Sequence, residues 1–283
     1  MIKIILPLCL LLTSVTSQAV PFSSIPCSAP AGLIENTIGY DSLDNLCDFQ
    51  AEQLKLKVYK IAVCTQAPSF SRVNQPDFST CSFIYNNDTY SEITVSANAG
   101  FNLSGLTKPA PGTYRYILLV TSNDVKIKAQ AHFDSSREAF TSGGGSGSYC
   151  WTNGSVVNYV GAPSKINNGL SCGIAVDSAS YGFNEIHWAS DLGRSDDPPE
   201  LVPGGNSVRS LLTANLLLTT VKADIIRTAY VNTLDTSITI TENTNALKMS
   251  INITTGATLV FNGSKIDWIE DAPFAYIIEP VNQ

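Results

Sequence analysis

The chain has 283 residues, of which 44% are hydrophobic and only 14% are charged. This length and apolar content are enough for a sizeable core, which excludes a chain that is disordered throughout. The formal net charge is −7, with 17 Lys and Arg against 24 Asp and Glu. That balance argues against nucleic acid and anionic membranes as partners, because contacts to phosphate need cations.

The first 19 residues have the pattern of a cleavable secretion signal. Lys3 gives a short positive start, residues 4–12 are an apolar run, and Ser-Gln-Ala at 17–19 has the small-x-small spacing of a cleavage site. The run is too short for a spanning helix, which needs about 20 apolar residues, and no later segment is long enough. We therefore expect a mature chain from Val20 without a transmembrane segment, either secreted, at the cell surface or in a periplasm.

Six cysteines remain in the mature chain, and export favours reading them as disulfides. The sequence cannot choose among the possible pairings, but pairing each cysteine with its neighbour along the chain is the simplest scheme. A zinc site is disfavoured because there is no Cys-x2-Cys pair. The predicted bridges are Cys27–Cys47, Cys64–Cys81 and Cys150–Cys172.

Alternation of apolar and polar residues dominates the chain and predicts an all-β fold with little helix. The expected architecture is an antiparallel β-sandwich, as one large unit or two consecutive units. Residues 54–63 predict a strand whose lysines form one basic face. Residues 113–121 and 125–129 predict a hairpin that turns at Asn123-Asp124.

Two segments carry weaker helix signals, at residues 43–54 and 210–221. In the second, the β-branched residues at 219–221 favour strand over helix. Towards the C-terminus, residues 238–269 alternate almost perfectly and are interrupted by short turn signals such as Asn262-Gly263. This pattern predicts a meander with one buried face.

A run of glycine and serine at residues 142–148 suggests a boundary in the chain. It is either a flexible linker between two β units or a surface loop within one sandwich. The linker interpretation divides the mature chain into an N-terminal disulfide-bonded unit at 20–141 and a C-terminal unit at 149–283.

One stretch near residue 187 could carry acid–base or metal chemistry. Glu185 and His187 share a face of a predicted strand and could form an acid–base pair. Oxygen ligands in the acidic loop that follows could hold Ca²⁺, although the loop lacks the spacing of a calcium loop and also fits a solvated acidic turn. The candidate metal ligands are Glu185, His187, Asp191, Asp196, Asp197 and Glu200.

Two tryptophans are candidates for stacking on sugars. They are Trp151, which follows Cys150, and Trp188. The alternative for Trp151 is that it packs against the disulfide in the core, as tryptophans often do in sandwiches.

The function that the sequence favours is non-enzymatic and needs no cofactor. We expect an exported structural or surface subunit that assembles with copies of itself into a filament, coat or adhesive layer, because open sheet edges can accept a neighbour's strand. The alternative is a secreted module that binds a surface polysaccharide or another polymer, and a secreted hydrolase is the third hypothesis.

Overall fold

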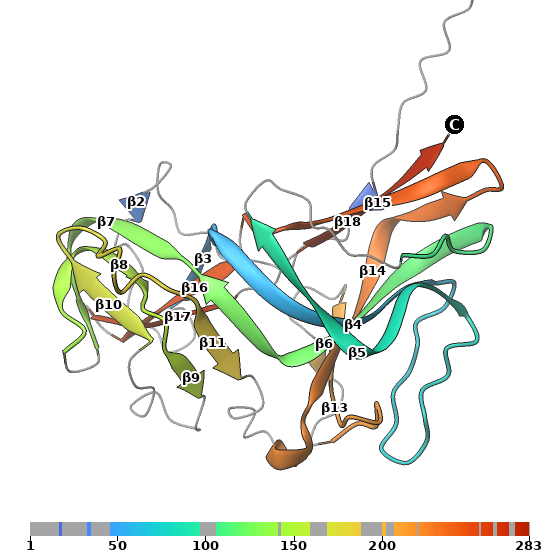
Figure 1. Cartoon of the computed structure of the whole chain (residues 1–283), viewed down its shortest axis with the longest axis horizontal. Helices are drawn as coiled ribbons and strands as arrows, with labels where there is room; N and C mark the ends of the chain where they lie inside the picture. Colours follow the sequence, from blue (N-terminus) through green and yellow to red (C-terminus); the bar gives the residue numbers. More distant parts are fainter. Residues whose placement is uncertain are drawn as a thin grey trace, which may run out of the picture.

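The protein is almost entirely β-sheet in the part of the chain that the structure, a computed structural model, describes (Figure 1). Strands are arranged in sheets of eight, seven and three strands, and most strand pairs are antiparallel. This confirms the predicted all-β class. The described residues are 17–18, 33–34, 46–96, 106–140, 143–158, 169–187, 200–201, 207–219, 221–254, 256–262, 265–271 and 275–282.

The largest sheet has the order β12-β13-β14-β6-β11-β9, with β4 beside β6 and β5 beside β4. The strands of this eight-stranded sheet are β4 (Gln53–Cys64), β5 (Cys81–Ser96), β6 (Gly112–Lys128), β9 (Val156–Asn158), β11 (Asn184–His187), β12 (Glu200–Leu201), β13 (Ser207–Leu212) and β14 (Arg227–Ile240).

The second sheet has the order β10-β8-β7-β17-β16-β3, with β2 beside β7. Its strands are β2 (Leu33–Ile34), β3 (Leu46–Phe49), β7 (Gln130–Ala139), β8 (Ser146–Thr152), β10 (Leu170–Gly173), β16 (Ala257–Asn262) and β17 (Lys265–Asp271). The three-stranded sheet consists of β1 (Ser17–Gln18), β18 (Ala275–Asn282) and β15 (Thr244–Asn252), in that order.

One apolar core is shared by all three sheets. It includes Leu54 and Ile127 from the eight-stranded sheet, Phe133 and Leu259 from the seven-stranded sheet, and Ile278 from the three-stranded sheet, all at most 1% exposed. Because burial of apolar surface is the main favourable term in folding, this common core holds the sheets together.

The chain crosses directly from one large sheet to the other between β6 and β7. β6 ends at Lys128 and β7 begins at Gln130, so Ala129 alone separates them. Thr152 fixes this corner, because its N–H donates to the Ala129 oxygen at 3.0 Å and its Oγ1 accepts from the Ala129 N–H at 3.2 Å. A strand that changes sheets at a bend is a common way to wrap two sheets around one core.

The predicted turn at Asn123-Asp124 is wrong, because β6 runs through both residues without reversing. Asn123 is buried, donates its N–H to the Ile226 oxygen at 3.0 Å and accepts from Thr228 Oγ1 at 3.2 Å. The register between β4 and β6 shifts at this point, so the polar residues occupy a β-bulge and not a hairpin turn.

Neither helix candidate forms in the described residues. Residues 46–49 and 53–54 belong to β3 and β4, and β13 runs to Leu212 before a turn. The only helix among the described elements is the single 3-10 turn η3, Lys222–Asp224.

The prediction of a C-terminal meander is partly wrong. The buried face of β15 is confirmed by Met249 and Ile251, and β16 and β17 form a hairpin as predicted. However, β15 pairs with β18, whereas β16 pairs with β3 from the N-terminal part of the chain. The alternation specified which residues are buried, but not which strands are neighbours.

The described part of the glycine-rich segment leads directly into a strand. β8 begins at Ser146, and strands from both sides of the segment pair with each other: β6 with β14, β7 with β17 and β3 with β16. Each large sheet therefore contains strands from both sides of residues 142–148, so this segment is not a boundary between the two sheets.

Two of the predicted disulfides are present. Cys64 and Cys81 face each other across β4 and β5, and Cys150 and Cys172 face each other across β8 and β10. Cys47 is also disulfide-bonded, but its predicted partner Cys27 lies outside the described residues.

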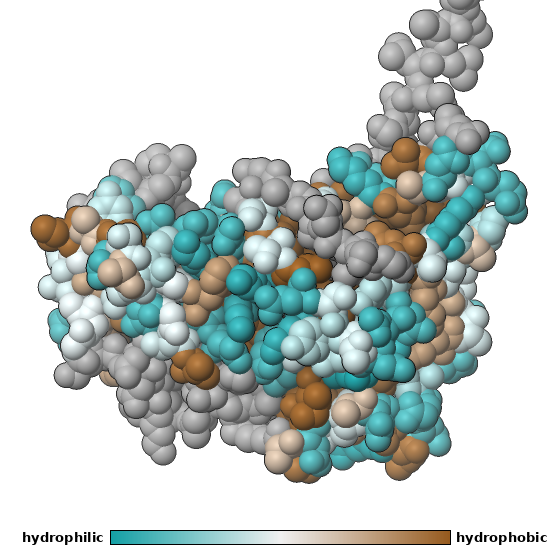
Figure 2. All heavy atoms as spheres, viewed as in Figure 1, coloured by the Kyte–Doolittle hydropathy of each residue, from teal (hydrophilic) through white to brown (hydrophobic). Residues whose placement is uncertain are grey.

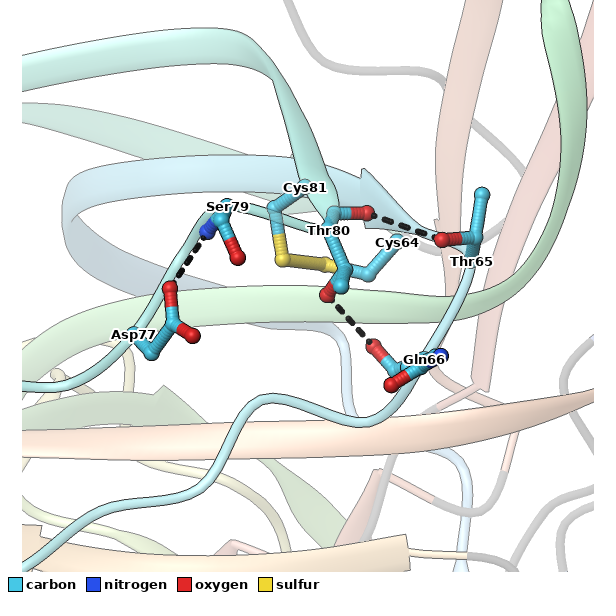
Figure 3. Close-up of a disulfide and its surroundings, with 7 residues drawn as sticks. All are labelled: Cys64, Thr65, Gln66, Asp77, Ser79, Thr80 and Cys81. Carbon is cyan, nitrogen blue, oxygen red and sulfur yellow. Dashed lines mark hydrogen bonds between the residues drawn. A yellow bond between two sulfur atoms is a disulfide. The ribbon is translucent and has the colours of Figure 1, made fainter.

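The first bridge closes a loop that is held by several polar contacts (Figure 3). Asp77 Oδ1 accepts the Ser79 N–H at 2.8 Å, and Thr65 Oγ1 donates to the Thr80 oxygen at 3.4 Å. Phe70 and Phe78 from this loop pack on a second apolar cluster on the outer face of the eight-stranded sheet, which includes Leu118 and Leu218.

The close approach of β8 to the β10 strand gives a stability prediction. A Cβ at Gly147 would lie 1.9 Å from the carbonyl carbon and oxygen of Gly173, which are backbone atoms that cannot rotate away. We expect Gly147→Ala to lower the free energy of unfolding by about 3 kcal/mol or more, at the upper end of overpacking costs. Urea unfolding measures this change.

Gly143→Ala is the matched control, because nothing lies within 4 Å of its Cβ position although its φ is +88°. We expect it to cost only about 1–2 kcal/mol of backbone strain. Equal unfolding midpoints for the two variants would contradict the tight contact.

Candidate functional site

The structure describes three of the six residues of the predicted metal or acid–base site. Glu185 on β11 has its carboxylate 3.3 Å from Lys126 Nζ on β6. His187 stands at the end of β11, opposite Asp124, and Glu200 begins β12, which is joined to β6 through β13 and β14. Within the described ranges, no three His, Cys, Asp or Glu side chains group as metal ligands. Asp191, Asp196 and Asp197 lie outside those ranges.

Trp151 is not available as a stacking surface for sugars. It is only 4% exposed, and its Nε1 donates to Ser180 Oγ at 3.2 Å. Its ring lies 3.1 Å from the Cβ position of Gly173. Because side chains alternate along a strand, Trp151 and Gly173 lie on the face opposite the Cys150–Cys172 bridge. Trp151 is therefore buried, but not against the disulfide as the alternative predicted, and Trp188 lies outside the described residues.

A short sequence match to the nucleophile motif of hydrolases lies in a strand and has a structural role. Residues 169–173 read Gly-Leu-Ser-Cys-Gly, the Gly-x-Ser-x-Gly spacing of hydrolase nucleophiles. In that motif the serine sits on a strained turn from strand to helix. Ser171 instead lies inside β10, opposite Trp151, and its Oγ accepts from Asn153 Nδ2 at 3.3 Å. The match does not form a nucleophile.

Glu185 lies beside a row of lysines on the outer face of the eight-stranded sheet. Lys55 lies on β4 directly opposite Lys126 on β6. Lys57 and Lys128 lie two residues further along the same strands, so all four side chains share one face. This confirms that β4 has the predicted basic face, and β6 extends it.

Three of the four ammonium groups are paired with carboxylates. Lys57 Nζ lies 3.4 Å from Asp124 Oδ2, and Lys126 Nζ lies 3.3 Å from Glu185 Oε2. Lys128 Nζ lies 3.3 Å from Glu52 Oε1. These ion pairs hold the lysines in fixed positions across the sheet.

Aromatic rings complete this surface. The ammonium of Lys55 lies 4.4 Å from the centre of the Phe183 ring, and that of Lys128 lies 4.2 Å from the centre of Tyr181. Lys57 Nζ lies 5.4 Å from the Tyr90 ring, which is 48% exposed. These distances fall in the range of cation–π contacts. We call the surface the lysine–aromatic face; its members are Lys55, Lys57, Lys126, Lys128, Glu52, Asp124, Glu185, Tyr90, Tyr181 and Phe183.

Burial and neighbouring charges shift the pKa values of two groups of the face. Burial alone would lower the pKa of Lys57, but the charge and hydrogen bond of Asp124 outweigh it, and the pKa is raised. Burial raises the pKa of Tyr181 far above its ordinary value, and the hydrogen bond that its hydroxyl donates to Glu52 adds to this shift. The lysine is therefore charged and the tyrosine neutral at neutral pH.

The sequence patterns did not identify the aromatic members of the face. Lys126 and Lys128 alternate with apolar residues as Lys55 and Lys57 do, and that pattern could have revealed two basic rows. Nothing local places Phe183 or Tyr90 beside them, because each ring comes from a different part of the chain.

A second feature with functional potential is the outer edge of β18. One side of β18 pairs with β15 along its length. On the other side, the described part of the chain pairs with β18 only through β1, with Ser17 opposite Ile278 and Gln18 opposite Ile277. Figure 1 shows β15 and β18 at the end of the molecule opposite β8 and β10. We call the side of β18 that faces β1 the β18 edge.

A buried carboxyl group lies apart from both features. Asp267 on β17 is 3% exposed, and its Oδ1 has no hydrogen-bond partner. The register between β16 and β17 shifts beside it, so Asp267 occupies a bulge. Burial raises its pKa to about 6, because the charged form is poorly solvated.

This shift predicts a pH dependence of stability. The folded state binds a proton to Asp267 more tightly than the unfolded state, in which the pKa is about 4. The contribution is fully present below about pH 4 and is lost as the pH rises to about 6, by roughly 2–3 kcal/mol. Asp267→Asn should remove this decline in urea unfolding measured from pH 4 to pH 7.

Asp235→Asn, at an exposed position of β14, is the control and should keep the wild-type profile. A wild-type stability that rises steadily across this range in parallel with Asp267→Asn would contradict the assignment.

Comparison with known proteins adds no relative, since no family model, curated protein or solved structure matches the chain. Among the described residues, no helix has the length and apolar composition needed to span a bilayer. Function must therefore be argued from the geometry of the chain itself.

Proposed function

We propose that the mature protein is an exported, non-enzymatic structural or surface subunit that assembles with copies of itself by adding a strand to the β18 edge. The observation that carries the proposal is the origin of β1. Its residues, Ser17 and Gln18, belong to the segment predicted to be removed on export, so cleavage after Ala19 would take β1 away from β18.

An uncovered β18 edge would leave backbone groups without partners. β1 pairs with two residues of β18, which runs from Ala275 to Asn282. Unpaired N–H and C=O groups on an edge strand form a template for a strand of another chain. A second copy of the chain can supply such a strand, so assembly needs no separate partner protein.

The side chains of β18 favour this use of its edge. Ile278 is fully buried, Ile277 is half-buried and Val281 is 44% exposed. An added strand would bring further apolar surface against them.

The edge formed by β5 is blocked in two ways. β5 contains a register shift in which residues 87–90 have no partner on β4. Further along β5, the Thr107 N–H donates to the Ile84 oxygen at 2.7 Å, and the Ala110 N–H donates to Ser82 Oγ at 3.0 Å. Bulges and covering loops are how proteins block unwanted strand pairing. We therefore place the proposed assembly at β18 and not at β5.

Assembly should depend on the exposed apolar side chains of β18. For the mature chain from Val20, we expect oligomers whose mass rises with concentration, measured by sedimentation velocity and electron microscopy. Ile277→Lys with Val281→Lys should weaken association by about tenfold or more, because charges on an edge strand oppose pairing.

Ile174→Lys is the matched control, because Ile174 is an apolar residue that is 89% exposed and lies outside β18. It should assemble like the wild type, and all variants should keep the wild-type melting temperature. A chain that begins at Val15 retains β1 and should assemble less readily. A strictly monomeric mature chain, or equal assembly of all variants, would refute the proposal.

A further inference from the structure

We infer that the lysine–aromatic face is a binding site for a neutral polysaccharide, a polymer of hexoses without charged groups. The site is separate from the β18 edge and does not depend on assembly. The inference follows from the position of the face, the balance of its charges and the exposure of its rings.

The face is the part of the outer surface of the eight-stranded sheet that no other described segment is seen to cover. The other part of that surface is covered by the second apolar cluster, where the loop closed by Cys64–Cys81 packs, and the Leu218 N–H donates to the Ser71 oxygen at 2.9 Å. Figure 2 shows hydrophilic side chains gathered across the middle of the face in view, where Figure 1 places β4, β5 and β6. An extended polymer can lie along such an open strand surface.

The charges on the face are close to balanced. The four lysines lie beside Glu52, Asp124 and Glu185, and Glu92 on β5 is exposed and stands opposite Lys57. A polyanion would meet as many carboxylates as ammonium groups, and the whole chain carries −7. Hydroxyl groups can both accept from an ammonium and donate to a carboxylate, so a neutral polyol matches this surface and a polyanion does not.

Lys55 is the ammonium best placed to meet a ligand. Its contact in the structure is with the Phe183 ring, and no carboxylate among the described residues pairs with it. It stands directly opposite Lys126, an arrangement that costs stability when two like charges face each other. A hydroxyl oxygen of a sugar would complete its hydrogen bonding.

The rings supply flat apolar surface between the charges. Tyr90 is 48% exposed, and Tyr181 and Phe183 are partly exposed. Contacts with lysine ammonium groups at 4.2 and 4.4 Å hold the last two rings in position. Aromatic side chains bury large area at a low entropic cost, and rings that are already held lose little freedom on binding.

The first experiment uses affinity electrophoresis of the mature protein in gels that contain laminarin, mannan, dextran or hydroxyethyl cellulose. We expect retardation by at least one polymer and, with that polymer, binding that changes less than about twofold between about 50 and 500 mM salt, because no counterions are released. Tyr90→Ala and Phe183→Ala should each weaken binding about tenfold, the effect of losing one stacking contact.

Matched variants separate binding from folding and from assembly. Tyr149→Ala removes a ring that stacks on His132 in the seven-stranded sheet, and Lys248→Gln removes a lysine of β15 that pairs with Glu279. Both should bind as the wild type does, whereas Lys55→Gln should bind several-fold more weakly. The double variant Ile277→Lys, Val281→Lys should also keep full binding, which shows that the face acts without assembly.

Three results would overturn the inference. One is no retardation by any of the four polymers. Another is binding that falls steeply with salt and is shared by polygalacturonate or DNA, which would indicate a polyanion site. The third is equal loss of binding in the Tyr90→Ala and Tyr149→Ala variants when both keep the wild-type melting temperature.

Discussion

The whole structure depends on one apolar core, which β6 and β7 enter from both large sheets as the chain passes from one sheet to the other at Ala129. Their inward side chains, Ile127 on one side of the corner and Phe133 on the other, enter the same apolar core. Because that core is buried only when both sheets close on it, each sheet stabilises the other. The hydrogen bonds of Thr152 to Ala129 set the angle at which they meet.

This corner also determines what the outer surface can do. With one face of the eight-stranded sheet turned to the core, its polar side chains are collected on the opposite face. There the loop of the Cys64–Cys81 bridge covers an apolar cluster at one end, and the lysine–aromatic face occupies the other. The bulge at Asn123-Asp124 brings a carboxylate next to Lys57, so a local irregularity of the backbone balances a charge.

The two proposed activities use different parts of the molecule. The three-stranded sheet contributes to the core through Ile278 but offers a backbone edge, whereas the eight-stranded sheet offers a side-chain surface. A subunit that joins its copies through one end keeps the other surface free. An assembled array would then present many polysaccharide sites at once, and linked sites bind a polymer far more tightly than single ones.

The sequence by itself determined the class of fold, the buried side of strands such as β4 and β15, and two of the disulfides. These are local properties: a period of two residues decides which side chains face the core, and neighbouring cysteines meet when their strands pair. Only the tertiary structure decided which strands are neighbours. It paired β15 with β18, ran β6 through the expected turn and buried Trp151. It also brought Glu185 to Lys126 and away from any metal-ligand group among the described residues. The alternating pattern is the same whichever strand lies alongside, and partners are chosen by the closure of the common core.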